Sequence, residues 1–250
     1  MTAFDRWAHR PRRCLRVAAG AATLLVVLAV AAVVSAHTFS VDLSLHDWLV
    51  EHRTTGLTSA ALAVTATGAS GFLVPVVFLA ALVLGRGPRR GRLVQAVAMT
   101  AVLLSGIGLR LALVNLIARP RPPRRDWAGL ANGYAFPSGH TTTSALGAGL
   151  LIWLVLGRLT GVRRATVAAV LACWALAVGM TRAYLGVHWP TDVLGGWLLA
   201  LAWLSLAAAV VPRLLASDAP STGARPVRDT PALQGSAGQP GPTEATEAGA

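Results

Sequence analysis

Long apolar runs separated by short polar segments dominate this chain. Five runs that can form membrane-spanning helices are residues 17–36, 93–117, 138–157, 165–181 and 190–211. Each is long enough to cross the ~30 Å hydrocarbon core of a bilayer as a helix. Residues 57–85 form a further apolar stretch that Gly68-Ala-Ser-Gly71 interrupts, so we expect a lead-in followed by a spanning helix over about residues 69–85. The pattern predicts an all-α integral membrane bundle of six transmembrane helices.

The remaining segments are polar. Residues 1–16 are predicted to be a basic cytoplasmic N-terminus, because the apolar run after them is too long for a cleaved signal peptide. Residues 37–56 suit a solvated loop or a short interfacial helix, with Trp48 at the headgroup level. Residues 17–212 then form the membrane domain. Residues 213–250 are rich in Pro, Gly, Ala, Thr and Ser and predict a disordered cytoplasmic tail.

Composition supports a membrane protein, with 54% hydrophobic and 13% charged residues and a mean hydropathy of +0.59. All 22 basic residues are Arg, and the formal net charge is +12. A charge of this size can indicate nucleic-acid binding. The arginines instead cluster between apolar runs, where membrane topology explains them, so nucleic acid is not an expected partner. The all-Arg bias, with abundant Ala, Val, Leu and Gly, is typical of a GC-rich bacterial genome.

The arginine clusters also predict the orientation. The N-terminus, the turns at residues 86–92 and 158–164, and Arg213 fall on one side of a six-span chain, which the positive-inside rule makes cytoplasmic. Both termini of this plasma-membrane protein would then be cytoplasmic. The loop at residues 118–136 carries four arginines on the opposite, outer side, against the rule. An anionic ligand at the outer face explains the exception.

Three polar segments carry the candidate chemistry, and this topology places all of them on the outer side. They are Arg119-Pro-Arg121-Pro, Pro137-Ser-Gly-His140, and Thr181-Arg182 followed by His188 and Asp192. Polar groups at membrane depth are costly and usually functional. Separately, each segment has a structural explanation: a solvated basic loop, a helix cap beside an interfacial histidine, or a His–Asp cap. Together they favour one anion-binding site.

The residue types in these segments suit phosphate chemistry. Ser138 is placed to cap the helix that follows it, and Gly139 lacks the Cβ that would hold a ligand away from a phosphate-binding helix N-terminus. Guanidinium groups such as that of Arg121 bind phosphate oxygens in pairs. At a spacing of four residues, Asp192 can accept a hydrogen bond from one nitrogen of His188 and leave the other as a nucleophile or base.

In this order and spacing the segments resemble the type 2 phosphatidic acid phosphatase family, which includes vanadium haloperoxidases and bacterial acid phosphatases. The family signature is Lys-x6-Arg-Pro, Pro-Ser-Gly-His and Ser-Arg-x5-His-x3-Asp. The matching positions are Arg121-Pro122, Pro137–His140, and Arg182, His188 and Asp192, with Thr181 in place of the family serine. The resemblance covers about residues 40–211, and the six-span layout is that of the membrane branch.

The resemblance implies a lipid phosphatase that works through a phosphohistidine without a metal or other cofactor. The catalytic roles fall to His188 as nucleophile, Asp192 as the group that orients it, and His140 as general acid and then base. The phosphate-binding residues that it implies are Arg121, Ser138, Gly139 and Arg182. The small number of acidic residues in the membrane domain also argues against a carboxylate metal site.

One position departs from the family signature. The lysine of the first motif would fall at Val114, and the chain contains no lysine. Arg110 lies one turn earlier on the same helical face and is predicted to bind the same anion. Arg119, Arg124 or Arg125 are alternative replacements. Without a replacement, the phosphate site would be weakened or the protein would be inactive.

The expected substrate is an amphiphile with its phosphate at headgroup level, and the expected partner is the bilayer itself. A lipid phosphate or an isoprenoid diphosphate such as undecaprenyl diphosphate fits, and phosphatidic acid and phosphatidylglycerol phosphate are alternatives. A transporter, with Arg110, His188 and Asp192 as an intramembrane relay, and a non-catalytic membrane scaffold are hypotheses of other classes. The motif residues gather at one membrane face, which favours the enzyme. The sequence indicates no oligomeric state.

Overall fold

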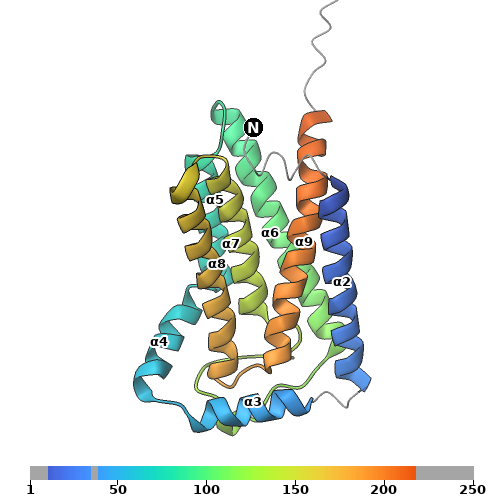
Figure 1. Ribbon diagram of the computed structural model, residues 1–250, viewed down its shortest axis with the longest axis vertical. Helices are drawn as coiled ribbons and strands as arrows, with labels where there is room; N and C mark the ends of the chain where they lie inside the picture. The colour runs from blue at the N-terminus through green and yellow to red at the C-terminus, as the bar shows by residue number, and fades with distance from the viewer. Residues whose placement is uncertain (1–10, 35–38, 218–250) are drawn as a thin grey trace, which may run out of the picture. The chain divides into compact units, whose positions relative to one another are not determined.

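The computed structural model describes residues 11–34 and 39–217, and these residues form helices and connecting loops without strands (Figure 1). The elements are α2 (Pro11–Val34), α3 (Ser40–Glu51), α4 (Thr55–Ala66), α5 (Ser70–Leu84), α6 (Arg89–Ile117), the short 3-10 helix η1 (Arg124–Asp126), α7 (Gly139–Leu156), α8 (Gly161–Tyr184) and α9 (Pro190–Ser217). Within the described ranges, α2, α6, α7, α8 and α9 are long and apolar enough to span a membrane, and the bent pair α4–α5 gives a sixth crossing if counted as one span. The predicted all-α membrane bundle is confirmed.

The broken apolar stretch is two helices. The axes of α4 and α5 differ in direction by 51° across the break. A Cβ at Gly68 would lie 2.4 Å from Cγ1 of Val178 on α8, so only glycine allows α8 to pack against this break. The predicted lead-in is therefore a full helix, and α5 begins where the spanning helix was expected.

Several helices extend beyond their predicted boundaries: α2 begins at Pro11, α6 at Arg89 and α8 at Gly161, each a few residues before the predicted span. The segment 182–189 was expected to be a loop, but α8 continues to Tyr184, so Arg182 lies in the last turn of a rigid helix. The tail was expected from residue 213, and α9 continues to Ser217 within that segment. The rest of the predicted tail, residues 218–250, and residues 1–10 of the predicted N-terminus lie outside the described residues.

The bundle is held together by small and branched apolar side chains. Its largest buried cluster joins α5, α6, α7 and α9 and includes Val77, Leu103, Leu146, Leu150 and Ala200. Many large apolar side chains instead point outward, as a protein surrounded by lipid requires; examples are Leu24, Val83, Leu104 and Val170.

Helix α3 lies across one end of the bundle, beneath the membrane-crossing helices (Figure 1). It is one of the two alternatives predicted for residues 37–56, a short helix rather than a solvated loop. Its outer face exposes apolar side chains, including Leu45 and Trp48, the latter 55% exposed. Its inner face buries Asp42 and His46. This amphipathic arrangement suits a helix at the membrane–water boundary.

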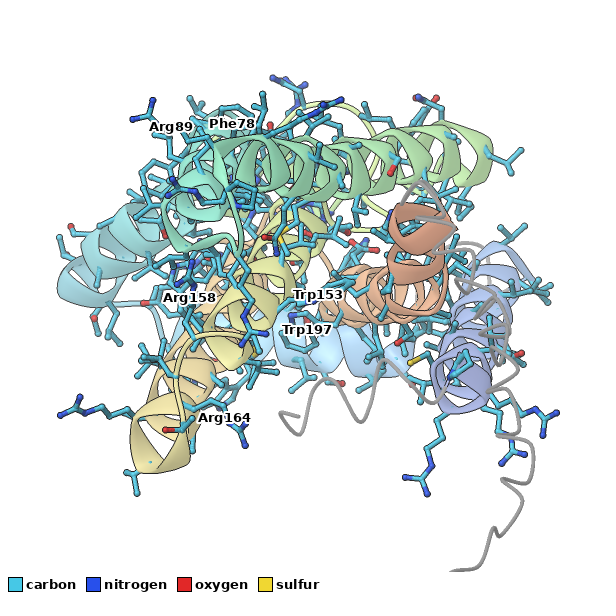
Figure 2. The ribbon with its side chains drawn as sticks, turned by 90° about the horizontal axis from the view of Figure 1, so that it is seen from above. Phe78, Arg89, Trp153, Arg158, Arg164 and Trp197 are labelled. Atoms are coloured by element: carbon cyan, nitrogen blue, oxygen red, sulfur yellow. The ribbon has the colours of Figure 1, made fainter. Side chains whose placement is uncertain are left out.

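Arginines gather at the opposite end of the bundle, which Figure 2 views along the helices. Arg158 Nε donates to the carbonyl of Leu84 at 2.7 Å, and the Arg86 guanidinium donates to the carbonyl of Gly157. These carbonyls stand at the C-terminal ends of α5 and α7, where helix carbonyls have no partner within the helix. The two arginines therefore tie neighbouring turns together at the end of the bundle away from α3.

Candidate active site

A cavity of about 270 Å³ opens at the α3 end of the bundle. The side chains around it come from α6, α7, α8 and two loops: Arg110, Arg121, Leu130, Ala131, Asn132, Gly139, His140, Arg182 and His188. Three are guanidinium groups, two are imidazoles, and none of these described lining residues is acidic. Such a lining suits a phosphate or another multivalent anion.

The start of α9 orients one of these imidazoles. Asp192, in the first turn of α9, accepts the backbone N–H of Trp189 on its Oδ2 at 2.8 Å, as in one half of a capping box. The same oxygen lies 3.5 Å from Nδ1 of His188. The carboxylate therefore lies near the imidazole, but Nδ1 of His188 has no hydrogen-bond partner among the described residues, so the hydrogen bond expected from the four-residue spacing is not formed in this structure.

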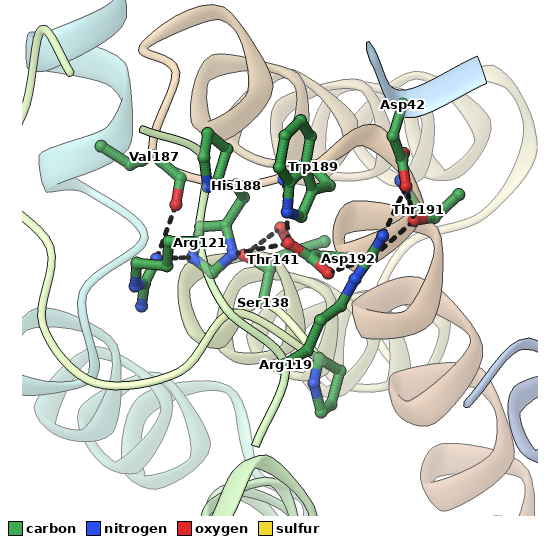
Figure 3. Close-up of polar contacts among 12 residues, drawn as sticks. Asp42, Arg119, Arg121, Ser138, Thr141, Val187, His188, Trp189, Thr191 and Asp192 are labelled. Atoms are coloured by element: carbon green, nitrogen blue, oxygen red, sulfur yellow. Dashed lines mark hydrogen bonds and ion pairs between the residues drawn. The ribbon is translucent and has the colours of Figure 1, made fainter. Parts of the chain in front are cut away.

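Arg121 determines which ring nitrogen of His188 carries the proton (Figure 3). Its Nη1 lies 2.9 Å from Nε2 of His188. A guanidinium group can only donate, so Nε2 must accept, and the ring proton belongs on Nδ1, opposite Asp192. Arg121 is held in place by backbone carbonyls, including those of Gly133 at 2.9 Å and Val187 at 2.7 Å. The nitrogen with the lone pair is thus on the cavity side.

The surroundings of His188 keep it neutral. The side chain is only 2% exposed, and this burial lowers the pKa of His188 well below its usual value of 6.5. The nearby guanidinium groups of Arg121, Arg182 and Arg110 lower the pKa of His188 further. Burial also lowers the pKa of Arg121, to about 10, which leaves that guanidinium charged at neutral pH. A neutral imidazole beside fixed cations is suited to attack an anionic electrophile.

Arg110 reaches the cavity from α6. Its Nε donates to the carbonyl of Pro137 at 2.9 Å, just before α7 begins. A Cβ on Gly139 would lie 3.2 Å from Cζ of Arg110, so the absence of a side chain there lets the guanidinium approach the helix N-terminus. His140 follows as the second residue of α7 and lines the same cavity. Arg110 therefore stands where the sequence placed a substitute for the missing lysine.

The alternative replacements are used elsewhere. Arg124 and Arg125 are exposed, and neither lines the cavity. Arg124 lies over the ring of Trp127, with Cζ 5.6 Å from the ring centroid. Arg119 is fully buried behind the cavity, between two carboxylates.

Ser138 departs from its predicted role. It occupies the N-cap position of α7, but its side chain makes no capping hydrogen bond and instead accepts from Thr141 Oγ1 at 3.0 Å. Its backbone N–H, predicted to bind phosphate, donates to the backbone carbonyl of Asp192 at 3.0 Å. Ser138 is fully buried and does not line the cavity. It joins α7 to α9, which places the two histidines on connected elements.

Arg182 is fixed from two sides at the end of α8. Its Nη1 donates to Oγ1 of Thr65 on α4 at 3.0 Å, and its Nη2 donates to the carbonyl of Leu130 at 3.4 Å. The side chain is buried but still lines the cavity. Its position on a helix, rather than in the predicted loop, gives the third guanidinium a rigid support.

Sequence analysis missed a buried ionic cluster behind the imidazole. Arg119 Nη1 donates to Asp192 Oδ1 at 2.6 Å, and its Nη2 donates to Asp42 Oδ2 at 2.6 Å (Figure 3). Asp42 comes from α3, which supplied no candidate residue. The available signal was a carboxylate between two apolar residues, Val41 and Leu43, within the predicted interfacial segment.

Comparisons with known proteins agree with this geometry. The PAP2 superfamily model matches residues 52–215. Phosphatidylglycerophosphatase B of Bacillus subtilis (strain 168) is 33% identical over 144 residues, which are 55% of this chain and 67% of that protein. An undecaprenyl-diphosphatase of Sulfolobus acidocaldarius is 38% identical over 72 residues, 29% of this chain and 31% of that protein.

A solved structure is also similar. It is the transmembrane PAP2 type phosphatidylglycerolphosphate phosphatase from Bacillus subtilis, with a TM-score of 0.70 and 25% sequence identity. The match covers 79% of this chain and 97% of that one. The bundle and its connections are therefore those of a known membrane enzyme architecture.

Proposed function

This chain belongs to the PAP2 superfamily and is a membrane lipid phosphatase, and from that premise we propose that it hydrolyses a lipid phosphate or isoprenoid diphosphate through a phosphohistidine, without a metal. The observation that carries the proposal is the position of His188 Nε2, which accepts a hydrogen bond from Arg121 at the wall of a cavity lined by three guanidinium groups; the phosphate would take over this contact with Arg121 when it binds. Phosphoryl transfer depends mainly on such positioning and on neutralising charge on the phosphate oxygens.

The first step forms the covalent intermediate. Nε2 of His188 attacks phosphorus while the bond from phosphorus to the leaving oxygen breaks, and His140 gives that oxygen a proton. The imidazole of His188 becomes positively charged, and the Asp192 carboxylate beyond Nδ1 stabilises this charge. Arg110, Arg121 and Arg182 hold the phosphoryl oxygens throughout.

The second step releases phosphate. His140, now neutral, takes a proton from water as the water oxygen attacks phosphorus. The phosphorus–nitrogen bond breaks, and its electron pair returns to Nε2 of His188. Both histidines then have their starting protonation, and inorganic phosphate leaves. One side chain thus serves as acid in the first step and base in the second.

The substrate phosphate is proposed to approach from the headgroup region of the outer leaflet, with both termini in the cytoplasm. Exposed arginines at the end of the bundle away from the cavity, including Arg89 and Arg158, support this orientation under the positive-inside rule. An apolar pocket of about 370 Å³ between α3, α4 and α8, lined by residues such as Leu57 and Met180, provides a surface for the hydrocarbon chain. Both relatives named above act on amphiphiles of this kind.

A panel of substrates tests the proposal. Purified protein in detergent should release phosphate from at least one of undecaprenyl diphosphate, phosphatidylglycerol phosphate and phosphatidic acid, and the ranking identifies the substrate. EDTA should leave the rate unchanged, and vanadate, a phosphate mimic, should inhibit it. Absence of release from every member would favour the non-catalytic scaffold, and a rate abolished by EDTA would exclude the metal-free mechanism.

The pH dependence should reflect the depressed pKa of His188. Because the neutral form is the nucleophile, the acidic limb of the kcat/KM profile, which reports protonation of His188, should lie below pH 6.5. Arg121→Met removes a neighbouring cation and should move this decline to higher pH. The measurement is a pH–rate profile corrected for the ionisation of the substrate phosphate by ³¹P titration. A corrected midpoint above 6.5 would contradict the neutral, buried nucleophile.

Arg110 should supply the charge that the family lysine provides elsewhere. Arg110→Leu is expected to lower kcat/KM by about 10²-fold, because one fixed phosphate donor is lost. Adding Val114→Lys to this variant should restore part of the activity, since that position is one turn away on the same helix. Arg124→Leu, which removes an exposed arginine of the neighbouring loop, is the matched control. Full activity in Arg110→Leu would show that this side chain does not bind phosphate.

A further inference from the structure

The buried cluster behind His188 contains more charge than orientation of the imidazole requires. Asp42, Arg119 and Asp192 are all fully buried. The single guanidinium joins the two carboxylates through contacts of 2.6 Å on each side. With both carboxylates ionised, the cluster carries one net negative charge, and Oδ2 of Asp192 lies 3.5 Å from Nδ1 of His188.

Asp42 also fixes the start of α9. Its Oδ1 accepts the backbone N–H of Thr191 at 2.9 Å, and its Oδ2 accepts the hydroxyl of the same residue at 2.6 Å. The first N–H groups of a helix have no partner within that helix. Asp42 therefore caps α9 from a different helix, and its side chain determines where the first turn of α9, including Asp192, is held.

We propose that Asp42 and Arg119 are positioning residues for phosphoryl transfer, which hold Asp192 opposite His188 and keep one net negative charge behind the imidazole. The inference rests on the phosphohistidine mechanism proposed above. Asp42 lies before residues 52–215, the part matched by the family model, so this function of α3 is additional to the motifs. Both side chains act through Asp192, and neither lines the cavity.

The charge balance predicts which step is affected. When Nε2 attacks phosphorus, the imidazole becomes cationic, and the net negative charge behind it favours that change. Asp42→Asn keeps the shape but lets Arg119 neutralise Asp192, so formation of the intermediate should slow. Arg119→Gln leaves two carboxylates without their shared cation and should slow the step differently, through misplacement of Asp192. The double variant restores one net negative charge.

The experiment measures single-turnover formation of phosphohistidine by rapid quench, at several substrate concentrations. Asp42→Asn and Arg119→Gln should each slow the step by about 10–100-fold, the usual cost of losing a partner that orients a functional group. The half-saturating substrate concentration should change less than about threefold, because the phosphate-binding arginines are untouched. In the double variant, the rate of phosphohistidine formation should fall by clearly less than the product of the two fold-losses measured in the single variants.

Matched controls come from the same segments. Asp47→Asn changes an exposed carboxylate on α3, and Arg125→Gln changes an exposed arginine of the loop that carries Arg119. Both should form the intermediate at the wild-type rate. If Arg119→Gln does not elute as a folded protein, Arg119→Lys replaces it, and slower formation of the intermediate in that variant at unchanged half-saturation supports the inference, whereas a wild-type rate would overturn it.

The outcomes separate the inference from the mechanism on which it rests. Three results would each overturn the inference alone. They are a wild-type rate of phosphohistidine formation in Asp42→Asn, a change in the half-saturating substrate concentration without a change in that rate, and a rate in the double variant that falls by the product of the two single losses. Wild-type turnover with no phosphohistidine would contradict the proposed mechanism, and the inference would fall with it. Slower formation of phosphohistidine at an unchanged half-saturating substrate concentration, with partial recovery of the rate in the double variant, supports both the inference and the mechanism.

Discussion

His188→Ala should reduce phosphate release by about 10⁴-fold or more, the largest effect expected of any single substitution in this protein. The variant loses the nitrogen that attacks phosphorus, and the cavity offers no second imidazole in the same place. His140 lies on α7 and faces the phosphate from the leaving-group side in the proposed mechanism. Rapid quench with ³²P-labelled substrate measures the result directly, since the variant should trap no acid-labile phosphoenzyme.

The matched control is His52→Ala, which removes an exposed histidine at the end of α3. It should retain wild-type release and wild-type trapping. Vanadate binding provides a second readout, because the arginines remain in place and His188→Ala should still bind the anion, although less tightly. If His188→Ala keeps more than about a tenth of the activity, another group is the nucleophile and the proposed mechanism is wrong.

His140→Ala should show a loss that depends on the leaving group. With a lipid phosphate, whose leaving oxygen needs a proton, the rate should fall by about 10²–10⁴-fold. With an aryl phosphate that leaves as a stable phenolate, the first step should be nearly unaffected. Hydrolysis of the intermediate should remain slow, because no base activates water. Stopped-flow measurement should therefore show a burst of phenolate equal to the enzyme concentration, followed by slow turnover.

The same aryl phosphate distinguishes the two histidines. His188→Ala should give no burst, and the double variant should behave like His188→Ala. If His140→Ala lowers the rate equally with the lipid phosphate and the aryl phosphate, and no phosphoenzyme accumulates, His140 would be assigned to phosphate binding rather than to proton transfer. Proton transfer by a different cavity group would then have to be sought.

Local periodicity made much of this molecule predictable. Apolar runs of sufficient length can satisfy their backbone in lipid only as helices, so the crossing helices followed from hydropathy. The proximity of Asp192 to His188 followed from the geometry of one helical turn, but the expected hydrogen bond did not. Arg110 lines the cavity, and its binding of phosphate stays a prediction. In each case the interacting groups lie within a few residues of one another, where sequence spacing specifies geometry.

Contacts between distant segments were not predictable in this way. Arg119 was predicted as an alternative replacement for the missing lysine, yet its guanidinium is buried between the carboxylates of Asp42 and Asp192, which come from two distant helices. Arg121 faces the cavity and Arg119 faces the bundle interior. Ser138 was misassigned because its N–H bonds a carbonyl of α9, a partner that only the packed bundle supplies. Helix α4 was missed because weakly amphipathic segments near a bend give no clear period.

The pairing of Asp42 with the start of α9 also constrains how the protein is made. The partners are 149 residues apart, so Asp42 leaves the ribosome on the order of 10 s before Thr191 at the usual rate of protein synthesis. An ionised carboxylate is costly to hold unpaired in hydrocarbon. Because α3 lies across the end of the bundle instead of within it, Asp42 can stay hydrated during that interval. The site therefore cannot be complete until α9, which carries Asp192, has been synthesised and packed against α3.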